Sequence, residues 1–267
     1  MILLPENQYY KLSALLDRID FNNLFARAVI DHVVDGRVYV DSVNDPRTYY
    51  IVHKYGMSLL GGDHKNDKFN KAFLDYVINA SKTRTTVDWM QVFPAEWNGA
   101  LEDLLKDQLK SGVVELNTRV NFKFDADRYR RLTDTNPKDP SINITRFIPD
   151  LFDKMNGSVV PNTFWNTADD FNDMGVGFSL YYDDKLAAVS FSSFLAPGKL
   201  ELGIETLPDF RGKGLAERVC AALIDYCLGK NLEPIWACRL ENTGSFKLAK
   251  KLGFVPAREM PYYKLSV

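Results

Sequence analysis

Apolar and polar positions along this chain follow two periods, one helical and one extended, and their order predicts a mixed α/β protein. Apolar side chains spaced three and four residues apart favour helices, and strict alternation favours strands. In the first half this pattern predicts, in order, helices within residues 6–31, strands at 37–43, 48–53 and 55–60, a helix at 67–80, a strand at 85–93, a helix at 95–109 and a strand or hairpin at 113–124.

The second half repeats the alternation of strands and helices. The predicted elements are helices at 144–155 and 162–171, strands at 176–182, 185–194 and 200–207, a helix at 214–228, a strand at 234–240, a helix at 243–252 and strands from Phe254 onward. Asp183-Asp184 is a good hairpin turn, and Gly253 is a typical helix C-terminal residue. The predicted fold class is therefore α/β, with a mixed α+β sheet.

The periodic pattern breaks at DADRYRRLTDTNPKDPSINIT, residues 125–145. Charged residues, two prolines and few large apolar side chains are typical of a linker or a long surface connection. We therefore expect an N-terminal α/β domain at 1–125, a linker at 126–143 and a C-terminal domain at 144–267.

The two halves share one order of elements, which suggests a duplicated domain. A gap-free alignment places Gly112-Val113-Val114 against Gly253-Phe254-Val255, and Asn121-Phe122-Lys123-Phe124 against Tyr262-Tyr263-Lys264-Leu265. Identity between the halves is low, so the duplication rests on the order of elements. A first half without the strand-helix-strand-helix order of the second would contradict it.

Composition and charge narrow the function classes. The chain has 267 residues, 46% hydrophobic and 25% charged, with a formal net charge of -2. Such a charge gives no overall basic surface for nucleic acid or anionic lipid, and no apolar run is long enough to span a membrane. MILLPENQYYKL lacks the cationic start of a secretion signal, and Cys220, Cys227 and Cys238 form no disulfide or zinc pattern. We expect a cytoplasmic protein without a metal, a nucleic-acid partner or a membrane partner.

The stretch KLELGIETLPDFRGKGLA, residues 199–216, carries the clearest chemistry. It predicts a strand, a glycine-bearing turn and a helix N-terminus in succession. Unpaired N–H groups and the helix dipole make such an N-terminus an anion site. Gly212 and Gly214 let a phosphate approach the backbone closely, and Arg211 and Lys213 add positive charge beside it. This stretch therefore predicts a phosphate-binding turn.

Two blocks in the second half, RGKGLA at 211–216 and NTGSFKLAKKLGF at 242–254, resemble the motifs of the GNAT superfamily of acyl-CoA-dependent N-acyltransferases. A P-loop and a dinucleotide-binding G-x-G-x-x-G are both absent. Arg211-x-x-Gly214-x-Ala216 instead matches the family motif [QR]-x-x-G-x-[GA]. The run NTGSFKLAKKLGF, residues 242–254, is similar to the family's later helix, and the spacing between the blocks agrees. FWNTADDF and WACRLENTGSFKLAKKLGF resemble more narrowly the branch that includes zwittermicin A acetyltransferases.

The resemblance covers about residues 144–267 and implies a strongly twisted mixed sheet with helices on both faces. The smaller α/β domain before it would then be a degenerate GNAT-like copy, because its counterpart of the phosphate turn, GGDHKN at 61–66, lacks the motif. The resemblance implies that acyl-CoA lies where the strands 200–207 and 234–240 splay apart. The cofactor-binding residues that it implies are Ile204, Thr206 and Leu207 on the strand, Arg211, Gly212, Lys213, Gly214, Leu215 and Ala216 in the turn, and Asn242 and Ser245 near the pantetheine arm.

Transfer to an amine also requires removal of a proton. An amine with a pKa of about 10.4 costs roughly 4.6 kcal/mol to neutralise at pH 7, so a base or a base-held water is expected. Glu201 and Glu205 lie four residues apart on the strand, hence on one face. Glu205 is closer to the expected thioester and is the first candidate base, with Glu201 second. Each could instead be a residue of a solvated sheet face.

The family often has a tyrosine in the second block that protonates the departing thiolate, and here that position is Ala249. Tyr262, Tyr263 or water would have to serve, or the acid is dispensable, or the protein binds CoA and reacts poorly. Cys238 could be a covalent nucleophile, but no histidine follows nearby, and a small core residue is the simpler interpretation.

The leading interpretation is an acetyl-CoA-dependent N-acetyltransferase that acts by direct attack of a primary amine of a small molecule. The alternative is a non-catalytic CoA-binding or interaction protein with the same fold. The sequence identifies neither the acceptor amine nor the acyl group, and it leaves both a monomer and a homo-oligomer open.

Overall fold

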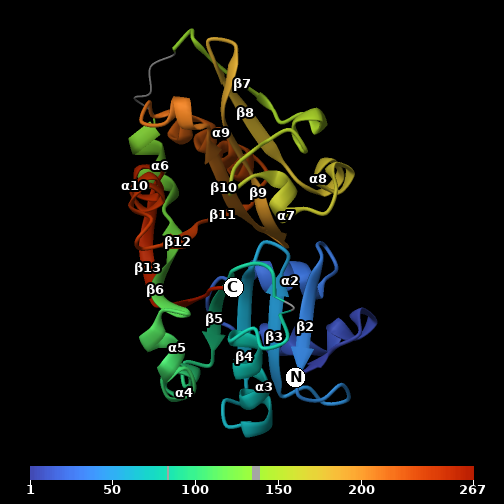
Figure 1. Ribbon diagram of the computed structural model, residues 1–267. Coiled ribbons are helices and arrows are strands. Elements are labelled where there is room, and N and C mark those ends of the chain that lie inside the picture. The colour runs from blue at the N-terminus through green and yellow to red at the C-terminus, as the bar shows by residue number, and fades with distance from the viewer. Residues whose placement is uncertain (83, 134–138) are drawn as a thin grey trace. The chain divides into compact units, whose positions relative to one another are not determined.

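The computed structural model describes residues 1–82, 84–133 and 139–267 and divides into two compact units. The first comprises Met1–Arg119, Arg239–Glu241 and Glu259–Val267, and the second comprises Val120–Cys238 and Asn242–Arg258. The last residues of the chain therefore belong with its beginning (Figure 1).

A twisted sheet with helices on both faces forms the first unit. The chain order is β1 (Ile2–Leu3), η1 (Glu6–Leu12), α1 (Ser13–Leu16), α2 (Leu24–Ile30), β2 (Gly36–Val40), β3 (Thr48–His53), β4 (Met57–Gly62), α3 (Asp67–Val77), β5 (Asp88–Phe93), α4 (Trp97–Leu104), α5 (Lys106–Ser111) and β6 (Val114–Phe124), which continues into the second unit. Strands β1 to β4 are antiparallel neighbours, and β5 lies parallel to β4.

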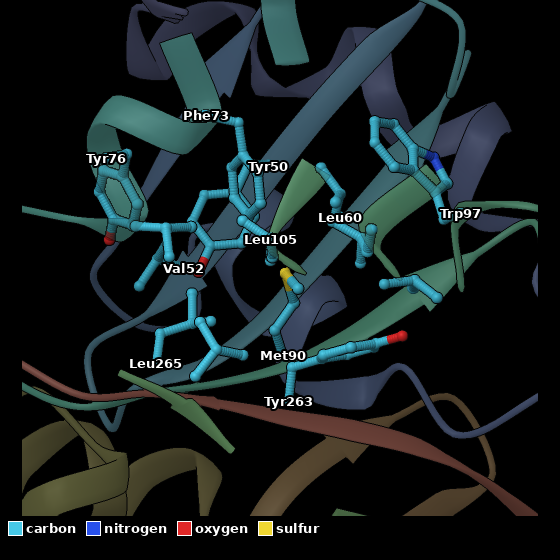
Figure 2. Packing of buried hydrophobic residues seen from close by; sticks show 14 of the residues in the cluster. Tyr50, Val52, Leu60, Phe73, Tyr76, Met90, Trp97, Leu105, Tyr263 and Leu265 are labelled. Carbon is cyan, nitrogen blue, oxygen red and sulfur yellow. The ribbon is translucent and has the colours of Figure 1, made fainter. Parts of the chain in front are cut away.

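The core of the first unit lies on both sides of β3, whose six residues are all buried. On one face Tyr50 lies in a buried cluster that also contains Phe73 of α3 and Trp97 of α4 (Figure 2). Residues of a strand alternate in direction, so Ile51 faces the other side, where α2 packs against β3. Tyr263, from the last strand of the chain, lies in the same cluster as Tyr50.

In the second unit the described elements are α6 (Ala126–Thr133), β7 (Ile142–Arg146), η2 (Pro149–Leu151), α7 (Pro161–Phe164), α8 (Ala168–Met174), β8 (Gly177–Tyr182), β9 (Lys185–Ala196), β10 (Lys199–Thr206), η3 (Pro208–Phe210), α9 (Leu215–Gly229), β11 (Glu233–Ile235), β12 (Ala237–Arg239), α10 (Thr243–Lys251) and β13 (Phe254–Leu265). The last residues of β12 and β13 belong to the first unit. The order β11-β10-β9-β8-β7 makes one sheet, parallel between β10 and β11 and antiparallel elsewhere.

Helices also cover both faces of this sheet. Leu200 and Leu202 of β10 pack against Leu223 of α9. On the opposite face, Phe191 of β9 lies edge-on to Phe164 of α7, with ring centroids 5.5 Å apart. The mixed α/β class expected from the sequence is therefore confirmed.

Three expected elements differ from the structure. Residues 144–155 were expected to be helical, but 144–146 lie in β7, because the β-branched Ile142, Ile144 and Thr145 pair with β8. Within the expected linker, 126–133 form α6, whose Tyr129 is buried and donates to Asp225 at 2.7 Å; residues 134–138 lie outside the described part of the chain. The expected strand 234–240 is two strands, β11 and β12, which belong to different sheets.

The order of elements in the first unit recurs in the second. Three antiparallel strands, a helix, a parallel strand, a helical region and a final strand appear as β2-β3-β4-α3-β5-α4-α5-β6 and as β8-β9-β10-α9-β11-α10-β13. Gly112 and Gly253 both follow the last helix in a left-handed conformation, with φ of 78° and 83°. The expected repetition of strand, helix, strand and helix is present.

Candidate functional site

Strand β10 is paired with a neighbouring strand along only part of one of its edges. Among the described strands, β11 pairs with β10 only over Lys199–Glu201, although β10 continues to Thr206. After Ile235 the chain passes through Trp236 into β12, in the other sheet. The splayed strands implied by the family resemblance are therefore present, and they part beyond Glu201.

The hydrogen bonds of β10 decide which residues face this unpaired edge. Leu207 donates its N–H to Ala187 at 2.9 Å, and its carbonyl accepts from Phe210 at 2.9 Å. Because antiparallel bonding alternates, the backbone groups of Ile204 and Thr206 point to the unpaired edge. The Thr206 carbonyl accepts from Arg211 Nε at 3.0 Å. Ile204 and the Thr206 N–H are thus suited to a ligand, whereas both backbone groups of Leu207 are already engaged.

The turn after β10 presents backbone donors to solvent. Gly212 and Gly214 have φ of 80° and 77°, a conformation that favours glycine. Gly214 is the N-cap of the 15-residue helix α9, and no side chain of the described residues caps this helix end. The N–H groups of residues 212–216 make no hydrogen bond within the described chain. Together with the helix dipole, these N–H groups are suited to bind an anion.

The two cations of the turn lie against protein groups. Arg211 donates to Thr206 and has Nη2 3.2 Å from Oε1 of Glu205. The Lys213 ammonium lies 5.0 Å from the ring centroid of Tyr182 and 5.4 Å from that of Phe210. Both residues are exposed, so their positive charge remains at the turn. The hydrogen-bond donors of the turn that have no partner in the described chain are therefore its backbone N–H groups.

Glu201 and Glu205 share the face of β10 opposite α9, because Leu200 and Leu202 pack on the α9 side. Their exposed fractions are 4% and 9%. Oε2 of Glu205 accepts from the N–H groups of Ser158 and Val159, each at 3.2 Å. The turn around Gly157 was not singled out in the sequence; its only signal was the glycine in MNGSVVP.

Asn242 and Ser245 lie at the start of α10. Asn242 is the N-cap, and its Oδ1 accepts from the Ser245 N–H at 3.1 Å. Oγ of Ser245 accepts from Nε1 of Trp236 at 3.1 Å. These bonds connect α10 to Trp236, the residue between β11 and β12.

The structure supplies no hydroxyl at the position of the missing tyrosine. Ala249 is fully buried in the cluster around α9. The two tyrosines considered as replacements belong to the first unit, where Tyr263 donates to Asn98 at 2.9 Å and Tyr262 stacks on Trp89 at 5.2 Å.

The corresponding region of the first unit is arranged differently. Strands β4 and β5 stay paired from Met57 opposite Trp89 to Gly61 opposite Phe93. Helix α3 is capped by Asn66, whose Oδ1 accepts from the Phe69 N–H at 3.1 Å. The edge and the helix N-terminus that are available in the second unit are thus occupied here by the protein itself.

In the described residues, no group of three or more His, Cys, Asp or Glu side chains is suited to a metal ion, and no helix is long and apolar enough to cross a membrane. Burial raises the pKa of the thiols of Cys220 and Cys227 to about 12, so both are protonated at neutral pH.

Comparisons with known proteins show the family of the chain. The family model described as GNAT acetyltransferase matches residues 14–263, and so covers both units. A protein of Bacillus subtilis (strain 168), the uncharacterized N-acetyltransferase YdfB, is 26% identical over 97% of each chain.

Two solved structures share the fold. A GCN5-related N-acetyltransferase-like protein from Streptococcus suis 89/1591 has a TM-score of 0.71 at 20% identity and covers 97% of this chain and 98% of its own. A tandem GNAT protein from the clavulanic acid biosynthesis pathway has a TM-score of 0.62 at 13% identity, over 98% of this chain and 97% of its own. With the match over 14–263, these findings show that the chain belongs to the GNAT acetyltransferase family.

Proposed function

We propose that this protein transfers an acetyl group from acetyl-CoA to a primary amine of a small molecule. The observation that carries the proposal is the unpaired edge of β10 directly before the uncapped N-terminus of α9. A thioester with a pantetheine arm needs strand-like hydrogen bonds, and a diphosphate needs clustered N–H donors. The second unit offers both in consecutive residues.

In this proposal acetyl-CoA is a substrate that supplies an activated acyl thioester. Ile204 and the Thr206 N–H would bond the pantetheine and the thioester carbonyl. The amides of Gly212, Lys213, Gly214, Leu215 and Ala216 would bind the diphosphate, with the charges of Arg211 and Lys213 nearby. Asn242 is exposed, and its amide nitrogen makes no hydrogen bond within the described chain, so it would reach the pantetheine arm. Ser245 would support it through the cap.

The chemistry is a direct transfer. The amine nitrogen attacks the thioester carbonyl carbon, a C–N bond forms, the C–S bond breaks, and the amine proton passes to a base. Glu201 and Glu205 are the carboxylates on the face of β10 away from α9. The thiolate leaves as CoA and is protonated by water, which needs no residue at the position of Ala249.

Ala249 also favours a second candidate, a protein that binds CoA without catalysis. A buried methyl group provides no proton for the leaving thiolate. The two candidates agree on cofactor binding and differ only in turnover.

Thiol release from acetyl-CoA, measured with a panel of small primary amines, distinguishes the two. We expect amine-dependent release, with the acetylated amine detected by mass spectrometry. CoA binding without acetylation of any amine in a broad panel would favour the non-catalytic candidate. Absence of CoA binding would contradict both.

A further inference from the structure

Glu205 makes contacts that differ from those expected of a base. Oε2 accepts two backbone N–H groups, from Ser158 and Val159, and Oε1 lies 3.2 Å from Nη2 of Arg211. Each hydrogen bond to a charged group changes the equilibrium constant for breaking that bond by roughly 10- to 100-fold. To accept a proton from an amine, this carboxylate would have to weaken bonds that it makes with the protein.

The turn that donates to Glu205 fits closely around it. A Cβ at Gly157 would lie 2.8 Å from Oε2 and 2.9 Å from Cδ and Cγ of Glu205. Real Cβ atoms do not approach so closely, so a larger residue at position 157 would require the Glu205 carboxylate or the turn to shift. The glycine and the glutamate are therefore matched, although 48 positions separate them in the chain.

The turn has apolar anchors at its ends and Glu205 at its centre. Met155 and Val160 are buried and pack with Val189 of β9, whereas 156–158 are exposed. Glu205 therefore holds the exposed part of the turn. Through Arg211 the same carboxylate also contacts the phosphate-binding turn, so three segments meet on one side chain.

We infer that Glu205 is a positioning residue that fixes the Gly157–Val159 turn to the end of β10, with Arg211 as its counter-ion. Glu201, the other carboxylate on that face of β10, then remains the candidate base of the proposed reaction. This inference rests on the proposed function for the base assignment, whereas the positioning contact can be tested in the free protein. It makes the turn, together with β10, part of the acceptor-binding side of the site.

The free protein provides the first test. Glutamine at position 205 keeps one acceptor oxygen and replaces the other by a donor. Glu205→Gln is therefore expected to speed hydrogen exchange of the Ser158 and Val159 amides about 10- to 100-fold, the effect of one charge-assisted bond. Gly157→Ala, which leaves the carboxylate chemically intact, should do the same. Ser158→Ala is the matched control, because it keeps the backbone N–H, and it should exchange like the wild type. Unchanged exchange in both test variants would overturn the positioning contact even if no activity is found.

Steady-state kinetics tests the role in catalysis. Glu205→Gln and Gly157→Ala are each expected to raise the KM for the amine about 10-fold and to keep the acidic limb of the pH–rate profile. In the double variant, the two effects on KM should combine less than additively, because both changes disturb the same contact. Glu201→Gln is expected to remove that limb and to lower kcat about 100-fold or more. Loss of the limb in Glu205→Gln, with an unchanged KM for the amine and wild-type behaviour of Gly157→Ala, would instead make Glu205 the base.

Discussion

At the residue scale, two buried titratable groups of the first unit, His53 and Asp88, contribute to stability with opposite dependence on pH. Burial lowers the pKa of His53 from 6.5 to about 3, so the folded protein keeps it neutral. Burial raises the pKa of Asp88, although Tyr50 and Tyr76 donate to its Oδ2 at 2.8 and 2.6 Å. Both groups favour the neutral form because desolvation penalises charge.

We predict that His53 makes the first unit sensitive to mild acid. In the unfolded chain His53 takes up a proton below pH 6.5, whereas the folded form resists protonation down to about pH 3. Its contribution to stability is therefore present above pH 6.5 and falls by about 1.4 kcal/mol per pH unit below it. Asp88 contributes with the opposite sign, because its proton binds more readily in the folded state.

The measurement compares the wild type with His53→Asn, which keeps an acceptor near the Tyr55 N–H that His53 Nδ1 now binds at 2.9 Å. Stability is measured as the opening free energy of the β3 amides, by hydrogen exchange at several pH values. At each pH, the difference in opening free energy between the wild type and the variant removes the contributions of Asp88 and the other carboxyl groups, which both proteins share. A difference that stays flat from pH 7.5 to 4.5 would show that His53 is not responsible.

At the element scale, the end of β13 completes the sheet of the first unit. Tyr263, Lys264 and Leu265 pair antiparallel with Met90, Trp89 and Asp88 of β5. Arg84 holds this segment: its guanidinium is buried and donates to the carbonyls of Leu265, Ser266 and Val77, each at 2.7 Å. A segment remote in sequence is therefore fixed by a buried cation.

Arg84→Leu is predicted to loosen the first unit. The variant leaves three carbonyls without their donor, and an orphaned buried acceptor costs about 1 to 3 kcal/mol, so a loss of about 3 kcal/mol or more is expected. Exchange of the Met90 and Val92 amides should quicken accordingly. Arg47→Leu, which removes an exposed ion pair with Asp45, is the control and should change stability by under about 1 kcal/mol. Equal effects of the two variants would contradict the role given to Arg84.

At the scale of the whole molecule, the two units share one topology but differ in whether a strand edge and a helix N-terminus are available to a ligand. The second unit has the unpaired edge of β10 and an uncapped α9. In the first unit β4 and β5 pair throughout, Asn66 caps α3, and Asp63 and Asp67 place negative charge at that helix N-terminus. We therefore propose that only the second unit binds CoA.

Titration calorimetry is predicted to find one CoA per chain. Gly214→Glu should lower the affinity about 100-fold or more, because it places a carboxylate at the phosphate turn and a side chain where φ is +77°. Gly214→Ala shares the backbone strain without the charge and should lower it less. Lys65→Glu, at the corresponding turn of the first unit, should leave binding unchanged. Two CoA molecules per chain would disprove the prediction.

Most of the elements could be predicted from the sequence because their signals are local. Hydrophobic periodicity located the strands around Asp183-Asp184, and glycines that must be left-handed marked the turn before α9 and the end of α10. The matching motifs also identified the family. Residues 144–155 were misread as helical because a short apolar run does not distinguish a helix from an edge strand.

The sequence by itself determined most of the order of elements and the likeness of the halves, and it predicted the phosphate-binding turn, since each depends on neighbouring residues. Only the tertiary structure decided where β10 and β11 part, that Glu205 is bound by backbone N–H groups 46 and 47 positions away, and that the end of the last strand belongs to the first unit. These features depend on pairings between distant segments. Such pairings follow from how whole faces pack, and no local pattern records them.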